Sequence, residues 1–167
     1  MARLGRLFGG QDASERFLRE VRGLPGVSVQ EPAPEAEIDR VEAFAGVRFP
    51  AAHRAVLLRA NGILACWGYR RLYGVGDDPE HIGPWNTPDM WKFAWPRPLD
   101  DYLMIAGSGW GDQYAYRISD LRRGIETIHR LDHVRMEPTP EAVADNVDMF
   151  LRAFQVEAHR HSPAVVE

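Results

Sequence analysis

Residues 102–118 read YLMIAGSGWGDQYAYRI, and the fold is decided in this stretch. An apolar run leads into GSGWGD, and QYAYRI then alternates with the period of a strand. A dinucleotide-binding loop needs GxGxxG followed by a helix whose N-terminus meets the phosphates. Here the spacing is GxGxG, a strand pattern follows, the charge of Asp112 repels phosphate, and no GK[ST] motif exists. The stretch therefore predicts a β-hairpin with Trp110 at its tip.

The alternation of apolar and polar residues continues beyond the hairpin, which predicts further strands and hence a sheet. Strands are predicted at 102–106, 113–118 and 125–130. A long C-terminal helix is predicted next, with Thr139 as its cap and Pro140 as its first residue. The apolar stripe expected on this helix consists of Val143, Val147, Phe150, Leu151 and Phe154.

Helical patterns precede the sheet. They cover residues 12–22, 34–46 and 50–62, and Gly or Asn-Gly ends the last two. A further strand is predicted at 69–75. The expected buried side of the second helix consists of Ile38, Val41 and Phe44.

Helices, then strands, then a helix are typical of an α+β fold, because the βαβ alternation of a parallel sheet is missing. We expect a largely antiparallel sheet of about four to six strands. Two or three N-terminal helices and one long C-terminal helix pack with it. The 167 residues are enough for one domain, so a single domain over 1–167 is predicted.

Composition limits the partners and the compartment. A net charge of −4 gives no reason to expect a nucleic-acid partner. Cys66 is the only cysteine, so no intrachain disulfide can form, which fits a reducing cytoplasm. The N-terminus lacks the apolar region of a signal peptide, and no run approaches the ~20 apolar residues of a membrane span. We expect a cytoplasmic protein without membrane contact.

The residues that could act in catalysis or bind a metal do not form a catalytic pattern in the sequence. His129 and His133 are four apart, but His129 falls at a strand end, so the two need not share a metal. Cys66 has apolar neighbours, which favours a buried structural thiol over a nucleophile. No GxSxG elbow exists. We therefore expect no catalytic residues, no metal and no cofactor. The alternative is an enzyme or ligand-binding domain that uses loop 76–101 and Asp112.

Acidic side chains and tryptophans gather in the predicted loops. Carboxylates steer a basic protein to its site, and aromatic side chains supply binding hot spots. The competing interpretation is a solvated acidic face over a packed tryptophan core. The residues that we predict to contact a partner are Asp77, Asp78, Glu80, Trp85, Trp91, Asp101 and Trp110.

The order of these motifs resembles the SUKH superfamily, which includes the yeast cell-wall-synthesis regulator and many bacterial immunity proteins. The similar segments are EIDRVEAFAGVRFP, AAHRAVLLRANG, GSGWGDQYAYRI, IETIHRLDH and VADNVDMFLRAF. Together they span about 35–155, which we take as the core, with 1–30 as an N-terminal extension and 156–167 as a frayed tail. The residues that match the family framework are Leu57, Asn61, Gly62, Gly111 and Asp112.

The resemblance implies an α+β domain without enzymatic activity. Bacterial members bind and neutralise a cognate toxin, often a nuclease, whose basic active site an acidic surface can occupy. The resemblance thus implies an immunity protein with a toxin partner, and a regulatory scaffold without a toxin is the alternative. Toxin-facing residues vary in the family, so none is carried over, and the oligomeric state stays open.

Overall fold

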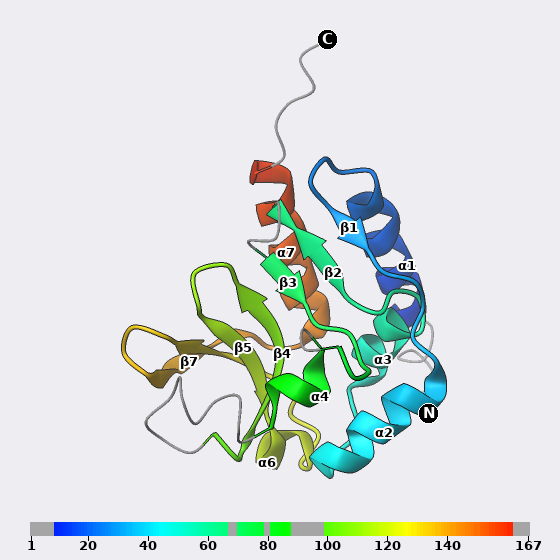
Figure 1. Ribbon diagram of the computed structural model, residues 1–167. Coiled ribbons are helices and arrows are strands. Elements are labelled where there is room, and N and C mark those ends of the chain that lie inside the picture. The colour runs from blue at the N-terminus through cyan, green and yellow to red at the C-terminus, as the bar shows by residue number, and fades with distance from the viewer. Residues whose placement is uncertain (1–8, 67–69, 79–80, 88–98, 162–167) are drawn as a thin grey trace, which may run out of the picture.

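The computed structural model describes residues 9–66, 70–78, 81–87 and 99–161. These residues form an α+β fold with six helices and one seven-stranded antiparallel sheet (Figure 1). The helices are α1 Gly9–Arg22, α2 Glu35–Ala45, α3 Ala51–Leu57, α4 Ile82–Trp85, α6 Ile118–Leu121 and α7 Val147–His161. The strands are β1 Ser28–Val29, β2 Ile63–Ala65, β3 Arg70–Leu72, β4 Tyr102–Ser108, β5 Gln113–Arg117, β6 Ile128–Asp132 and β7 Glu137–Ala144.

The strands follow one another in the sheet in chain order, and each pairs antiparallel with the next. The antiparallel sheet, the three N-terminal helices and the C-terminal helix are as predicted. The predicted count of four to six strands is wrong, because the described residues hold seven. β1 and β2 contain only two and three residues, too few for a period of two to show in the sequence.

The seventh strand replaces the predicted start of the C-terminal helix. Thr139 and Pro140 lie in β7, which pairs with β6, and α7 begins only at Val147. Proline lacks an N–H but is tolerated in a strand at the edge of a sheet, which is the position of β7. Asn146 is the residue that caps α7: its Oδ1 accepts the Met149 N–H at 3.0 Å.

The hairpin at the glycines is confirmed. β4 pairs with β5 from Tyr102 opposite Arg117 to Gly107 opposite Gln113, with a bulge between Met104 and Ala106. The connection from β5 to β6 differs in detail from the prediction: Ile118 starts the short helix α6, and β6 begins only at Ile128.

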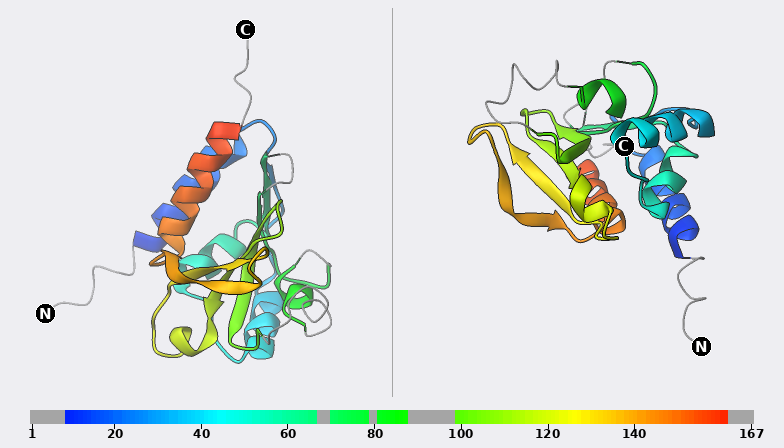
Figure 2. Two further views of the ribbon diagram at one scale, coloured as in Figure 1. Left: turned by 90° about the vertical axis from the view of Figure 1, so that its left-hand side faces the viewer. Right: turned by 90° about the horizontal axis from the view of Figure 1, so that it is seen from below.

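Helices cover the two faces of the sheet unequally. The left view of Figure 2 shows the sheet nearly edge-on, with α1 and α7 side by side on one side of it and α4 on the other. Phe17 of α1 packs edge-on against Phe154 of α7, with ring centroids 6.3 Å apart. Buried Phe17, Leu18 and Val21 place α1 in the main core, although it precedes the segment that resembles the family.

The buried side of α2 agrees with the prediction at two positions and differs at the third. Ile38 and Val41 are buried, but the stripe continues through Glu42, and Phe44 is 57% exposed. The prediction for Phe44 is therefore wrong. Gly46 ends α2 with a φ of 64°, the left-handed conformation that glycine adopts at low cost.

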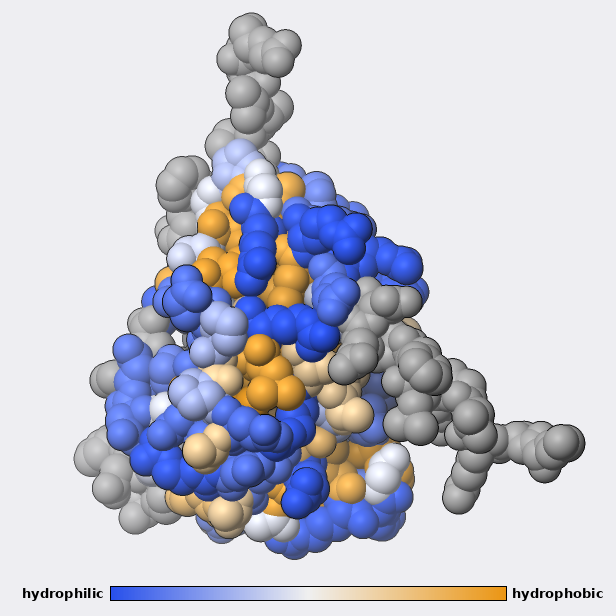
Figure 3. All heavy atoms as spheres, turned by 90° about the vertical axis from the view of Figure 1, so that its right-hand side faces the viewer, coloured by the Kyte–Doolittle hydropathy of each residue, from blue (hydrophilic) through white to orange (hydrophobic). Residues whose placement is uncertain are grey.

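Figure 3 shows the face on the right-hand side of Figure 1, which carries α1 and α2. Charged and polar side chains dominate it, and apolar side chains show in patches between them. This is the pattern of amphipathic helices whose apolar sides face inward. Among the described helices, none has the length and apolar character needed to cross a membrane.

Candidate functional site

The loop between β3 and α4 presents two of the predicted contact residues. Asp77 and Asp78 are exposed, and Asp77 Oδ1 lies 2.8 Å from an Arg40 guanidinium nitrogen on α2. Because 89% of the Asp77 side chain is exposed, this ion pair is weak and leaves its carboxylate accessible to a partner. Glu80 and Trp91 lie outside the described residues.

Trp85, at the end of α4, is packed. Its ring stacks on Tyr73 with centroids 5.5 Å apart and an interplanar angle of 11°. The Tyr73 hydroxyl in turn donates to Gln113 Oε1 on β5 at 2.7 Å. This position suits the interpretation of a tryptophan that supports the fold. We call the segment with Asp77 and Asp78, between β3 and α4, the acidic loop.

Asp101 and Trp110 lie beyond opposite ends of β4. The Asp101 carboxylate accepts hydrogen bonds from the Ser119 backbone N–H at 2.9 Å and from its hydroxyl at 2.6 Å. Trp110 is 70% exposed in the turn between β4 and β5. Seven residues of strand separate the two side chains by about 20 Å. The predicted contact residues therefore do not form one compact cluster.

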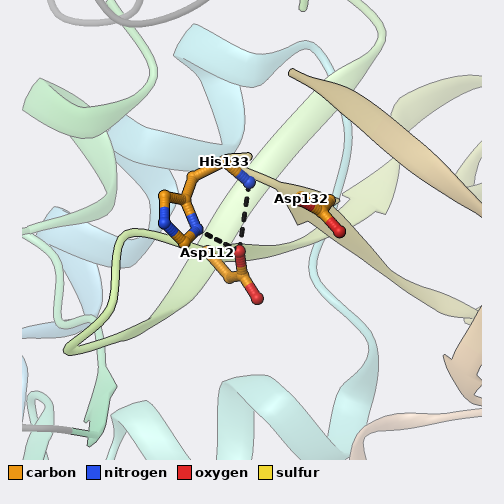
Figure 4. A group of neighbouring side chains, drawn as sticks. All are labelled: Asp112, Asp132 and His133. Atoms are coloured by element: carbon orange, nitrogen blue, oxygen red, sulfur yellow. Dashed lines mark hydrogen bonds and ion pairs between the residues drawn. The ribbon is translucent and has the colours of Figure 1, made fainter. Parts of the chain in front are cut away.

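Asp112 joins two hairpin turns. Its Oδ1 accepts the backbone N–H of His133 at 3.0 Å and lies 2.6 Å from the His133 ring Nδ1 (Figure 4). Gly111 lies against the same ring: a Cβ there would come within 3.0 Å of it, and the φ of Gly111 is 102°. We call the Asp112–His133 pair the hairpin latch, because it ties the β4–β5 turn to the β6–β7 turn.

Asp132 is the third member of the only group of potential metal ligands found among the described residues. The ligand atoms of Asp112, Asp132 and His133 lie within 4.8 Å of one another. Asp132 Oδ1, however, accepts the N–H groups of Val134 and Arg135 at 2.9 and 3.0 Å. The Arg135 N–H hydrogen bond is the main cause that lowers the pKa of Asp132. The carboxylates thus hold the turn in shape, and a cation would have to displace these donors.

Two exposed apolar residues lie next to the latch in the β6–β7 turn and were not predicted as contacts. Val134 is 77% exposed and Met136 is 36% exposed. With Trp110 they make up what we call the hairpin-tip surface. All three side chains are exposed, and they lie on the two turns that the latch ties together. The signal in the sequence was the apolar pair in LDHVRMEP, between two strands.

Two further histidines and the cysteine contact residues of the fold. His53 is fully buried between Phe49 and Tyr116, and burial lowers its pKa to about 3. His129 lies near Asp120 and Thr127, whereas His133 contacts Asp112, so the two do not share a site. Cys66 is buried, as predicted, and burial raises its pKa.

Comparison with known proteins places these features in a family context. The sequence model of the SMI1 / KNR4 family (SUKH-1) matches residues 32–153. No curated protein matches the chain. The matched segment begins after α1 and β1 and ends within α7.

Proposed function

Because the chain belongs to the SMI1 / KNR4 family (SUKH-1), a family of toxin-immunity type domains, we propose that it is an immunity protein that binds and neutralises a cognate bacterial toxin. Binding occludes the active site or an exosite of the toxin, and this chain performs no chemistry. The observation that carries the proposal is the match to the family over 32–153.

The use of the polar side chains in the described residues supports a binding role. Asp112 is committed to His133, Asp101 to Ser119, and His53 is buried. These contacts hold the turns and the core in shape, which gives each of the three side chains a structural role. The acidic loop and the hairpin-tip surface are the exposed features that suit a protein partner.

We propose that the acidic loop steers a basic toxin and that the hairpin-tip surface anchors it. Asp77 and Asp78 supply negative potential, which raises the association rate. Trp110 supplies apolar area that is removed from water on binding. Glu80, Trp85, Trp91 and Asp101 stay proposed contacts of the same interface.

The test starts from the toxin encoded beside this chain in the genome. Both proteins are expressed in the cytoplasm, co-purified, and scored for protection of growth. We expect a complex of nanomolar affinity. If the chain binds no product of a neighbouring gene, the proposal is wrong. Capture of several unrelated proteins would favour a regulatory scaffold instead.

Variants then locate the interface. Trp110→Ala is expected to raise the dissociation rate, and the double change Asp77→Lys with Asp78→Lys to lower the association rate, most at low salt. Glu141→Lys, an exposed carboxylate on the edge strand β7, is the control. If Trp110→Ala and the double change both bind the toxin like the wild type, the toxin docks elsewhere.

A further inference from the structure

Asn61, in the link between α3 and β2, holds the start of the acidic loop with its side chain. Its Nδ2 donates to the Val75 carbonyl oxygen at 2.9 Å, and the Val75 backbone N–H donates to its Oδ1 at 2.6 Å. The side-chain amide thus bonds both backbone groups of Val75, as a residue on a neighbouring antiparallel strand would. We call this pair of hydrogen bonds the Asn61 clamp. Val75 is 1% exposed, so its backbone groups rely on the clamp for partners.

Two glycines let the chain pack closely around the clamp. A Cβ on Gly74 would lie 2.3 Å from the Asn61 carbonyl oxygen and 2.5 Å from Asn61 Oδ1. Gly62 has a φ of 102°, and a Cβ there would lie 3.0 Å from the Gly74 nitrogen. The backbone on both sides of the clamp therefore has no room for an additional atom.

The residue that follows Asn61 is glycine, which makes the asparagine chemically labile. In such a pair the backbone nitrogen of the glycine can attack the side-chain carbonyl carbon of the asparagine, because glycine has no Cβ to obstruct the approach. The amide nitrogen leaves as ammonia, with the proton of the glycine nitrogen, and a cyclic imide forms. Water then opens either of the two C–N bonds of the imide. The net reaction consumes one water, releases one ammonia, and leaves aspartate or isoaspartate.

The clamp hinders this attack in the folded chain. The oxygen of the Asn61 amide accepts a hydrogen bond, and its nitrogen, which has to leave, donates one. Both bonds fix the plane of the amide, so its carbon can turn toward the next backbone nitrogen only after the clamp has opened. Local opening therefore limits the rate of the reaction, as it limits amide hydrogen exchange.

The reaction would break the clamp for good. A carboxylate has no N–H, so one of its oxygens would face the Val75 carbonyl oxygen, and two acceptors repel each other. Isoaspartate also lengthens the backbone after Asn61 by one carbon, where the glycine packing leaves no space. Asp77 and Asp78 follow shortly after Val75 in the chain, so loss of the clamp frees the base of the acidic loop.

We propose that Asn61 is a site of spontaneous deamidation that is gated by local opening, and that its conversion to aspartate or isoaspartate releases the acidic loop. Water is the only co-reactant. Because ammonia is lost, the change accumulates in chains that have opened. The proposal goes beyond toxin neutralisation, because the reaction belongs to this chain whether or not it binds a toxin.

Rates of deamidation test the gate. The full folded chain, the same chain in guanidinium chloride and a blocked peptide of residues 59–64 are incubated at one pH. Mass spectrometry of proteolytic fragments then measures the product at Asn61. We expect the folded chain to react at least about tenfold more slowly than the unfolded chain, and the peptide to react like the unfolded chain.

Asn86 is the internal control for the glycine. Its side chain bonds both backbone groups of Met104, with Nδ2 donating at 2.9 Å and Oδ1 accepting at 2.7 Å. Threonine follows Asn86, however, so the same kind of clamp lacks the reactive neighbour. In the unfolded chain Asn86 should therefore react more slowly than Asn61.

Two glycine variants test the role of the clamp. Gly74→Ala places a Cβ against the Asn61 amide and keeps the Asn-Gly pair, so the folded variant should react at a rate closer to that of the unfolded chain. Gly83→Ala is the matched control, since the nearest atom to a Cβ there is 3.6 Å away, an ordinary contact. Circular dichroism verifies that both variants are folded.

Asn61→Asp tests the release of the acidic loop directly. Amide hydrogen exchange at Val75 and in the acidic loop should be at least about tenfold faster than in the wild type. Asn86→Asp should instead speed exchange at Met104. If Gly74→Ala does not fold, this comparison and the rates of the wild type decide.

Four results overturn the proposal. They are a folded chain that reacts as fast as the unfolded chain, an Asn61 that reacts no faster than Asn86 in the unfolded chain, a folded Gly74→Ala that reacts like the folded wild type, and exchange at Val75 that Asn61→Asp leaves unchanged. All four are measured on the free chain without a toxin, so they leave the immunity proposal untouched.

Discussion

A change from pH 7 to pH 5 is expected to lower the free energy of unfolding by about 2 kcal/mol through His53 alone. The side chain is fully buried, with ring centroids 4.8 Å from Phe49 and 5.7 Å from Tyr116. The Tyr116 hydroxyl lies 3.3 Å from its Nδ1. Burial lowers the pKa of His53 from 6.5 to about 3. The imidazole is therefore neutral in the folded protein across this range.

Whether acid raises or lowers the free energy of unfolding depends on which state, folded or unfolded, takes up the proton at His53. Above pH 6.5 neither state is protonated at His53, and its contribution to stability is fully present. Below pH 6.5 only the unfolded chain is protonated, so stability falls until the folded pKa near 3 is reached. At pH 5 the pKa of the unfolded chain lies 1.5 units above the pH, which corresponds to about 2 kcal/mol in favour of unfolding.

Urea unfolding of the wild type and of His53→Gln at both pH values measures this effect. Glutamine does not titrate, and its amide oxygen can accept the Tyr116 hydroxyl. The pH-dependent loss of stability should therefore be about 2 kcal/mol smaller in His53→Gln. His129, whose pKa is also lowered mainly by burial, contributes equally to both proteins and cancels. His159→Gln, at an exposed position, is the control. If His53→Gln loses as much stability as the wild type, the assignment of the acid sensitivity to His53 is wrong.

Three further changes test contacts that hold the fold, each by chemical unfolding at neutral pH. Gly111→Ala should cost about 1–3 kcal/mol, because φ is 102° and the added Cβ meets the His133 ring at 3.0 Å. Arg54→Met should cost about 2–4 kcal/mol, because it leaves the buried Glu42 carboxylate without its ion pair at 3.0 Å. Asn146→Ala should cost about 1 kcal/mol, because it removes the side-chain cap of α7.

Each of these changes has a control in the same chain. Gly23→Ala adds a Cβ in open space and should leave stability nearly unchanged. Arg54→Met combined with Glu42→Gln should recover part of the loss, since no buried charge then remains unpaired. Asn146→Ser keeps an oxygen for the cap and should lose less than Asn146→Ala. Equal losses in a variant and its control would contradict the mechanism given for that residue.

The hairpin at 107–112 was readable from the sequence because its signals are local. Glycines permit the turn, and strand alternation follows within a few residues, which excluded a phosphate-binding loop. The same local reading failed at Thr139 and Pro140. A cap residue followed by proline signals a helix, and only pairing with β6 makes the segment a strand.

The candidate surfaces also combine features that local sequence signals predict with features that depend on tertiary packing. Trp110 was predicted at a hairpin tip, and the structure exposes it there. Val134 and Met136, on the turn that the latch ties to the turn of Trp110, lie more than twenty positions along the chain and were missed. The prediction of Trp85 as a contact stays a prediction, and only the structure shows that its ring is stacked on Tyr73. Side-chain packing of this kind depends on which face of the sheet each strand presents, and the composition of a loop does not contain that information.

The sequence by itself determined the α+β class, the family, the antiparallel hairpin and the absence of any recognisable catalytic motif. These properties follow from periodicity and turn chemistry, which act over a few residues. Only the tertiary structure decided that Asp112 latches onto His133, and that Arg70 of β3 pairs with Glu157 of α7. Such contacts join residues far apart in the chain, so they exist only once the register of the sheet is set.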